Sequence, residues 1–148
     1  MKRYQVINYH HLLSQIDLQK VDKDARAKLI NLDIVLGDMV DAHNDEVEKV
    51  KTRLSKGHEA EIQEVSALIS QLQTAEDKEA IKAQIDLHKD YAAIEQQLND
   101  EISKRLIEDV DVDVDKISSA DLAEWCAASG VRINLNVLRE LRKAGLTN

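Results

Sequence analysis

The sequence predicts a mainly α-helical protein. Its core is a long antiparallel helical hairpin, with a small two-stranded β ribbon joining the hairpin ends and two short C-terminal helices. Three observations support this fold class. The 148 residues include no Pro and no Phe, 32% of them are charged, and apolar residues recur at helical spacing on both sides of Gly57. Few aromatic side chains and many charges are typical of long helices that bury a narrow aliphatic stripe. We therefore expect one elongated domain over residues 1–148.

The first arm of the hairpin is expected from about residue 10 to residue 55. Asp22 is a suitable N-cap for its long part, because a short carboxylate can accept an N–H of the first helical turn. Steps of three and four residues separate the apolar positions, and a strand cannot produce that period. These positions are Leu29, Leu32, Leu36, Met39, His43, Val47, Val50 and Leu54.

Gly57 marks the predicted turn, since glycine readily takes the left-handed conformation that closes a helix. A second arm follows and reaches about residue 108, which gives a hairpin over residues 10–108. The segment from Thr74 to Asp77, TAED, resembles a capping box and indicates a break or kink. A kinked or partly three-helical arrangement is therefore the alternative. The second apolar stripe comprises Ile62, Val65, Ile69, Leu72, Ile81, Ile85, His88, Tyr91, Ile94, Leu98, Ile102 and Leu106.

Two segments flank the hairpin and are predicted as strands. Residues 3–9, RYQVINY, are rich in β-forming side chains, and residues 110–117 alternate valine with aspartate. Alternation places Val110, Val112 and Val114 on one face and the aspartates on the other. Both segments leave the same end of an antiparallel hairpin, so we expect them to pair as a ribbon.

Residues 118–148 are expected to form a small helical cap over the valine face. Ser118 with Asp121 forms a second capping box, and Asn134 can cap another helix. Gly130 and Gly145 stand where these two short helices should end.

The aspartate run raises the question of a calcium site. A calcium-binding EF-hand loop needs glycine at position 6 and glutamate at position 12. Counting from Asp109 gives Val114 and Ala120 at these positions, so calcium binding is only a weak alternative. None of the five histidines has zinc-site spacing, and His43 and His88 on the apolar stripes are interpreted as residues that fix helix register. The sequence therefore predicts no metal, cofactor or catalytic residue.

Charge is distributed unevenly. From Lys116 to Asn148 there are five Lys/Arg against three Asp/Glu, whereas the whole chain carries −8. An acidic body argues against nucleic acid and anionic membrane as partners. The lone Cys126 excludes an intramolecular disulfide and says nothing about the redox compartment. No apolar run has signal-peptide or membrane-spanning length, and this favours a cytoplasmic setting. The predicted interaction surface consists of Asp111, Asp113, Asp115, Trp125, Arg132, Arg139, Arg142 and Lys143.

The segments INYHHLL and KVDKDARAKL, with VDVDVDKISSADLAEW further on, resemble a loose family of small uncharacterised helical proteins of tailed bacteriophages. The resemblance implies a phage-encoded protein in an infected bacterial cell and supplies no catalytic residue. With the long, aromatic-poor hairpin, it favours a non-enzymatic interaction protein in particle structure or assembly, associating with itself or with another protein. The alternative is an inhibitor that sequesters a host defence protein or its signal molecule.

Overall fold

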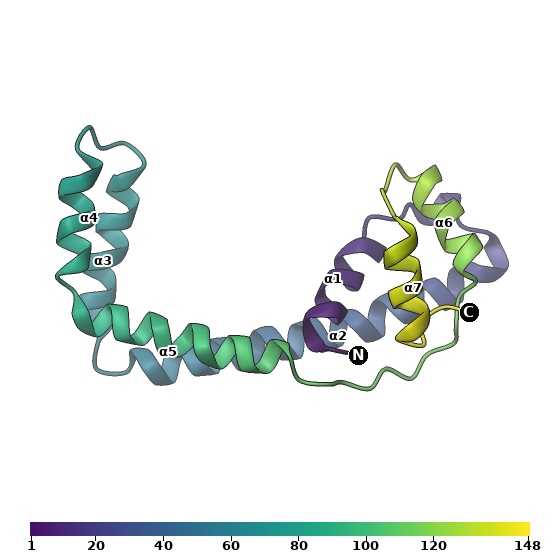
Figure 1. Cartoon of the computed structure of the whole chain (residues 1–148), viewed down its shortest axis with the longest axis horizontal. Coiled ribbons are helices and arrows are strands. Elements are labelled where there is room, and N and C mark those ends of the chain that lie inside the picture. The colour runs from purple at the N-terminus through teal and green to yellow at the C-terminus, as the bar shows by residue number, and fades with distance from the viewer. The chain divides into compact units, whose positions relative to one another are not determined.

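The computed structural model describes all 148 residues and contains seven α-helices and one short 3₁₀ helix. The chain divides into two compact units, where the sequence predicts one domain (Figure 1). The terminal unit consists of Met1–Asn44 and Leu106–Asn148, and the middle unit consists of Asp45–Arg105. Helix α2, Lys23–Ser55, contributes its first part to the terminal unit and its last turns to the middle unit. No helix combines the length and the apolar composition that crossing a bilayer requires.

The predicted strand at residues 3–9 is instead part of helix α1, Arg3–Leu13. Its buried side chains, Val6, Tyr9 and Leu13, follow one another by three and four residues, so they share one face of a helix. The helix begins where the Lys2 N–H donates to Gln5 Oε1 at 2.8 Å. A run of only seven β-forming residues is compatible with the period of a strand and with that of a helix. The helix forms because it buries the face that carries Val6, Tyr9 and Leu13.

The predicted β ribbon is absent, because the structure contains no strand. Residues 110–117 are extended, and a single antiparallel bridge joins Lys2 to Asp109. The Val110 N–H donates to the Met1 carbonyl oxygen at 2.8 Å, and pairing stops there because α1 begins at Arg3. A second isolated bridge joins Ile117 to Thr147 in parallel orientation.

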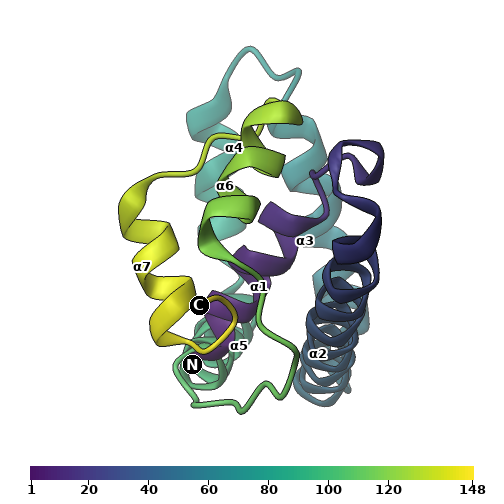
Figure 2. The same ribbon diagram turned by 90° about the vertical axis from the view of Figure 1, so that its right-hand side faces the viewer.

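The core of the terminal unit forms where α1, α6 and α7 gather around the first part of α2 (Figures 1 and 2). Helix α6 is Ser119–Ala128 and α7 is Leu135–Lys143, with the 3₁₀ helix η1 at Leu18–Lys20. Burying one large aliphatic side chain contributes about 1.5–3 kcal/mol, and this cluster is the main apolar core of the chain. Its buried members are Val6, Tyr9, Leu13, Ile16, Val21, Leu29, Leu32, Leu36, Ile117, Leu122, Trp125, Cys126, Leu141 and Leu146.

The predicted caps of the two C-terminal helices are confirmed. Ser118 Oγ accepts the Asp121 N–H at 3.3 Å, and Asn134 Oδ1 accepts the Val137 N–H at 3.0 Å. Each bond satisfies one backbone donor that the first turn leaves without a helical partner.

The middle unit turns at Gly57, which has φ of 85°, and the return path is three helices instead of one arm. These are α3, Glu59–Leu72; α4, Lys78–Asp86; and α5, Lys89–Leu106, whose last residue belongs to the terminal unit. The break before α4 lies at the predicted position, where Asp77 Oδ1 accepts the Ala80 N–H at 3.1 Å. Helices α3 and α4 lie side by side (Figures 1 and 2).

Helix α5 runs antiparallel to the last turns of α2 (Figure 1). Two ion pairs join these helices, Arg105 with Glu46 at 2.6 Å and Arg53 with Glu101. Val50 and Val65 are the only buried hydrophobic side chains of the middle unit. This unit therefore depends on half-buried aliphatic contacts and on polar links between helices.

Candidate functional site

An open hollow of the terminal unit lies between α6 and α7, and we call it the α6–α7 groove. Its volume is about 820 Å³. Aliphatic side chains contribute most of its wall. It is lined by Ala123, Ala127, Val131, Arg132, Ile133, Asn134, Leu135, Asn136 and Leu138.

Local sequence explains why this groove is open. Ala123 and Ala127 lie one turn apart on α6, so this face carries only methyl groups. Asn134 caps α7 and fixes its first residue as Leu135, whose side chain is 72% exposed. Further along α7, Leu141 is buried and holds the helix against the core. The exposed leucine is therefore held at the rim of the groove by an anchored helix.

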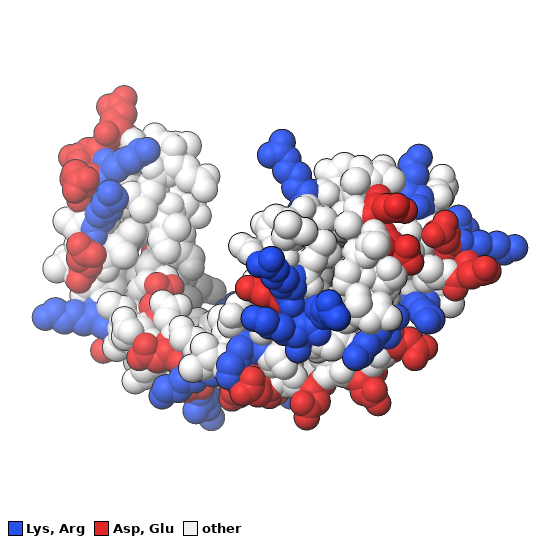
Figure 3. Space-filling model, turned by 45° about the vertical axis from the view of Figure 1, so that its right-hand side comes forward, with Lys and Arg blue, Asp and Glu red and all other residues white.

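Exposed cationic side chains occur in the groove wall and along α7. Arg132 lines the groove, while Arg139, Arg142 and Lys143 are exposed on α7. None of the four forms an ion pair within the chain. In the space-filling view, Lys and Arg side chains gather on the visible face of the terminal unit beside smaller acidic groups (Figure 3). An anionic ligand would meet cations that no internal carboxylate neutralises.

The structure separates the residues of the predicted interaction surface. Trp125 is 3% exposed and belongs to the core, so its inclusion in a surface was wrong. Asp111, Asp113 and Asp115 are exposed, but none of them lines the groove. These aspartates also form no cluster with metal-binding geometry, and the weak calcium alternative gains no support. Of the predicted residues only Arg132 lines the groove, and Lys143 borders a different hollow with Met1 and Gln5.

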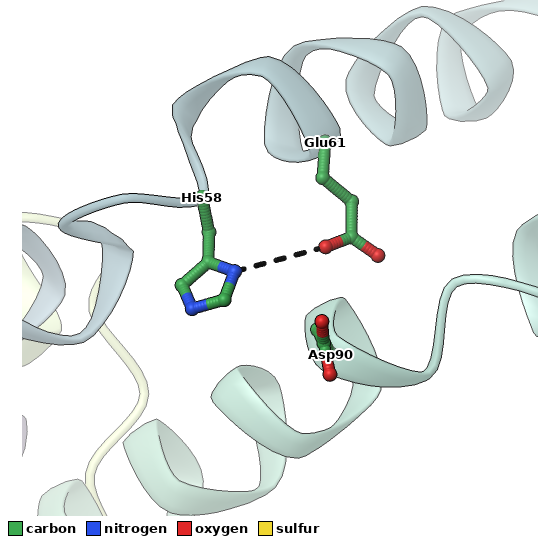
Figure 4. Close-up of side chains that lie close together, drawn as sticks. All are labelled: His58, Glu61 and Asp90. Carbon is green, nitrogen blue, oxygen red and sulfur yellow. Dashed lines mark ion pairs between the residues drawn. The ribbon is translucent and has the colours of Figure 1, made fainter.

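A second group of functional side chains lies in the middle unit, and sequence analysis missed it. His58, Glu61 and Asp90 each offer one ligand atom, and these atoms lie within 4.8 Å of one another (Figure 4). The His58 Nδ1 is 3.8 Å from Glu61 Oε2. On the other carboxylate oxygen, Glu61 Oε1 is 3.3 Å from His88 Nδ1. His88 therefore contacts a carboxylate, where the sequence interpretation gave it a role in helix register.

The turn at Gly57 and the start of α5 bring this cluster together. His58 is the N-cap residue of α3 and its imidazole makes no capping bond, so the ring lies over Glu61 one turn later. Asp90 stands in the first turn of α5. Carboxylates are stabilised at both positions by the partial positive charge of a helix N-terminus. The sequence signals are H-x-x-E at 58–61 and H-x-D at 88–90, and only the fold shows that they meet.

The other histidines lie apart from this cluster. His10 Nδ1 is 3.1 Å from Asp33 Oδ1 in the terminal unit, and His43 is buried at 5% exposure. Comparison with protein-family models, with curated proteins and with solved structures finds no match for this chain. The groove and the cluster are therefore interpreted from their own geometry and chemistry.

Proposed function

We propose that this chain acts by binding a protein partner through the α6–α7 groove. The observation that carries the proposal is Leu135, which is 72% exposed at the rim of an apolar groove of about 820 Å³. Isolated exposed leucines are common on protein surfaces, whereas an exposed leucine joined to a contiguous apolar hollow marks an interaction site. Burying this side chain against a partner would contribute about 1.5–3 kcal/mol.

The positive charge of this surface indicates an acidic partner. The cations at positions 132, 139, 142 and 143 have no internal carboxylate partner. A ligand with an apolar stripe and flanking carboxylates fits this surface, because the stripe fills the groove and the carboxylates meet the arginines. An acidic amphipathic helix has this chemistry, and helices commonly bind in apolar grooves of this kind. Complementary charge would also speed association.

A second copy of the chain is a less suitable occupant of the same groove. Two-fold pairing would place the cations of α7 against the same cations of the other copy, and like charges repel. Pairing through unlike surfaces is compatible with charge, since Asp111, Asp113 and Asp115 are exposed. Such heterologous contacts would form a ring or an open array. The predicted homo-oligomer would therefore not pair groove to groove by a two-fold axis.

We propose further that the chain is phage-encoded and takes part in particle structure or assembly. This part of the proposal is supported by the sequence resemblance alone. Mass spectrometry of purified virions tests it, because a structural part must be present in the particle. Absence of the chain from virions would count against a structural part and leave a transient assembly role. Location of its gene beside portal and tail genes would support the assembly setting.

The binding surface is tested by site-specific photocrosslinking in the producing cell. A photoreactive amino acid replaces Leu135, and the matched control carries it at Ile107, which is 63% exposed and does not line the groove. We expect an adduct with one acidic protein from position 135 and none from position 107. Combining the probe with Arg132→Glu and Arg139→Glu should abolish the adduct, since the charge match is reversed.

Three results would contradict the groove as the binding surface. They are the same adducts from both positions, no adduct from position 135, and an adduct that survives charge reversal. An adduct at twice the mass of the chain would identify a second copy as the occupant and overturn the acidic partner. Light scattering of the purified protein over a range of concentrations checks that outcome independently.

A further inference from the structure

We propose that the middle unit binds a divalent late transition-metal ion, such as Zn²⁺, through His58, Glu61 and Asp90. This inference is independent of the protein-binding groove, which lies in the other unit. The three ligand atoms lie within 4.8 Å of one another and come from two segments about thirty residues apart in the chain (Figure 4). The proposal assigns a function to the cluster that the sequence did not predict.

The geometry needs only a modest contraction to hold the ion. Zinc bonds of about 2.0–2.1 Å to nitrogen and oxygen place tetrahedral ligand atoms about 3.3 Å apart. His58 and Glu61 are fixed relative to each other by the first turn of α3, and Asp90 is exposed on α5. Side-chain rotations of Asp90 and His58 can bring the three atoms onto one ion without moving a helix. Water would complete the coordination on the exposed side.

The donor set indicates which ion fits. Imidazole nitrogen with carboxylate oxygen suits zinc and its neighbours in the first transition row, whereas Mg²⁺ and Ca²⁺ prefer oxygen ligands in larger number. No lysine or arginine pairs with Glu61 or Asp90. A divalent cation would neutralise two carboxylates that now face each other without a permanent cation between them. The charge balance therefore favours metal uptake.

His88 completes the site as a positioning residue. Its Nδ1 lies 3.3 Å from Glu61 Oε1, and the tautomer with the proton on Nδ1 donates to this carboxylate, since an ionised carboxylate only accepts. The bond leaves Oε2, the oxygen nearer His58, to bind the ion. Hydrogen bonds of this kind orient metal-binding carboxylates, and their loss typically weakens metal affinity.

Metal binding would also stabilise the middle unit. The ion would join the first turn of α3 to the first turn of α5, in a unit whose buried hydrophobic side chains are Val50 and Val65 alone. A ligand that binds only the folded state raises stability as its free concentration rises above the dissociation constant. Zinc should therefore slow hydrogen exchange in residues 59–105 specifically.

The test uses the full chain without a histidine tag, titrated with ZnCl₂ by calorimetry. We expect one ion per chain in wild type, and a loss of at least tenfold in affinity for His58→Ala and for Asp90→Asn. Glu61→Gln should have the same effect, and His88→Ala a smaller one. His11→Ala is the matched control, because His11 is exposed on α1 in the terminal unit and should leave affinity unchanged.

Two further measurements identify the ion and the site. Co²⁺ should give visible absorption bands of low-symmetry nitrogen and oxygen coordination in wild type, and these should disappear in His58→Ala. Excess Mg²⁺ or Ca²⁺ should not displace zinc. Far-UV circular dichroism of each variant verifies that the helices remain, so loss of binding reports the site and not the fold.

Several results would overturn the metal site. Unchanged affinity in a folded His58→Ala/Asp90→Asn double variant would show that other groups bind the ion. An equal loss in His11→Ala would show adventitious binding to surface histidines. Displacement of zinc by a moderate excess of Ca²⁺ would show that the imidazole does not take part. Each result leaves the photocrosslinking test at Leu135 unaffected.

Discussion

Tyr9 shows at the scale of one residue how burial and charge act together. Its side chain is 4% exposed on α1, and its hydroxyl donates to Glu140 Oε2 on α7 at 3.4 Å. Burial, followed by the negative charge of Glu140 and this hydrogen bond, raises the pKa of Tyr9 to about 12. Burial likewise raises the pKa of the Cys126 thiol, which is fully enclosed in the same core. Both groups are therefore held in their neutral forms.

The raised pKa of Tyr9 predicts a loss of stability at alkaline pH. The unfolded phenol ionises near pH 10 while the folded one stays protonated, so stability is complete below pH 10 and falls as pH rises towards 12. From pH 9 to pH 11 the Tyr9 contribution to the free energy of unfolding should fall by about 1.3 kcal/mol. Tyr9→Phe keeps the ring and should remove that part of the loss, measured by urea unfolding at both pH values.

Tyr91→Phe is the control for that experiment, because burial followed by its bond to Glu95 raises the pKa of Tyr91 to about 12 in the middle unit. It should alter alkaline unfolding of the middle unit and leave the Tyr9 effect in place. A Tyr9→Phe protein that loses as much stability as wild type between the two pH values would contradict the assignment.

The alternation at residues 110–115 correctly predicts which side chains are buried and which are exposed. The β strand that it was taken to indicate does not form. Val110, Val112 and Val114 pack against the core, and the intervening aspartates are exposed. A period of two requires only extended backbone, and that backbone needs no partner strand when a neighbouring core covers the valines. The pattern therefore predicts which side chains are buried, and leaves open whether a ladder forms.

At the scale of elements, helix boundaries follow from short-range chemistry. The turn at Gly57 and the caps at Ser118 and Asn134 were predicted because their partners lie within three or four residues. Residues 3–9 were not, because a short run of β-forming side chains fits either period and only burial of Val6 and Tyr9 selects helix. Helix boundaries can therefore be predicted from sequence where a capping residue or a glycine marks the end of the helix.

Gly57→Ala should destabilise the turn between α2 and α3. The φ of 85° is strained for a residue with a side chain, although a Cβ at this position would contact nothing within 4 Å. Backbone strain alone should then lower the free energy of unfolding of the middle unit by about 1–2 kcal/mol. Thermal unfolding followed by circular dichroism measures the effect.

Gly57→Asn provides the comparison, since asparagine tolerates the left-handed region better than alanine. Its loss should be smaller than that of alanine. Equal stability of wild type and Gly57→Ala would mean that the turn relaxes to a negative φ at no cost.

At the scale of the whole molecule, the two units differ in how they are stabilised. The terminal unit contains the fourteen-residue buried cluster, while the middle unit has two buried hydrophobic side chains. Regions with few buried apolar contacts open at lower free energy than the core. The middle unit should therefore open more readily, and its amides should exchange first.

Leu36→Ala and Val65→Ala test whether the units respond separately. Both side chains are 0% exposed, Leu36 in the terminal unit and Val65 in the middle one. Replacing the leucine should cost about 2–5 kcal/mol and accelerate exchange in α1, α6 and α7. Val65→Ala should accelerate exchange in α3 and α4 only. Hydrogen exchange with mass spectrometry measures both, and acceleration throughout the chain in either variant would show one cooperative unit.

The sequence by itself determined the helical class, the turn at Gly57 and the caps of α6 and α7, and it indicated a break or kink near residue 74 as one of two possibilities. Each depends on interactions within about one helical turn, so the interacting residues are close together in the sequence. Only the tertiary structure decided that residues 3–9 are helical, that Trp125 is buried and that His58, Glu61 and Asp90 meet. Those outcomes depend on contacts between segments far apart in the chain. The local sequence allows more than one conformation, and the free energy of burying apolar side chains against distant segments decides between them.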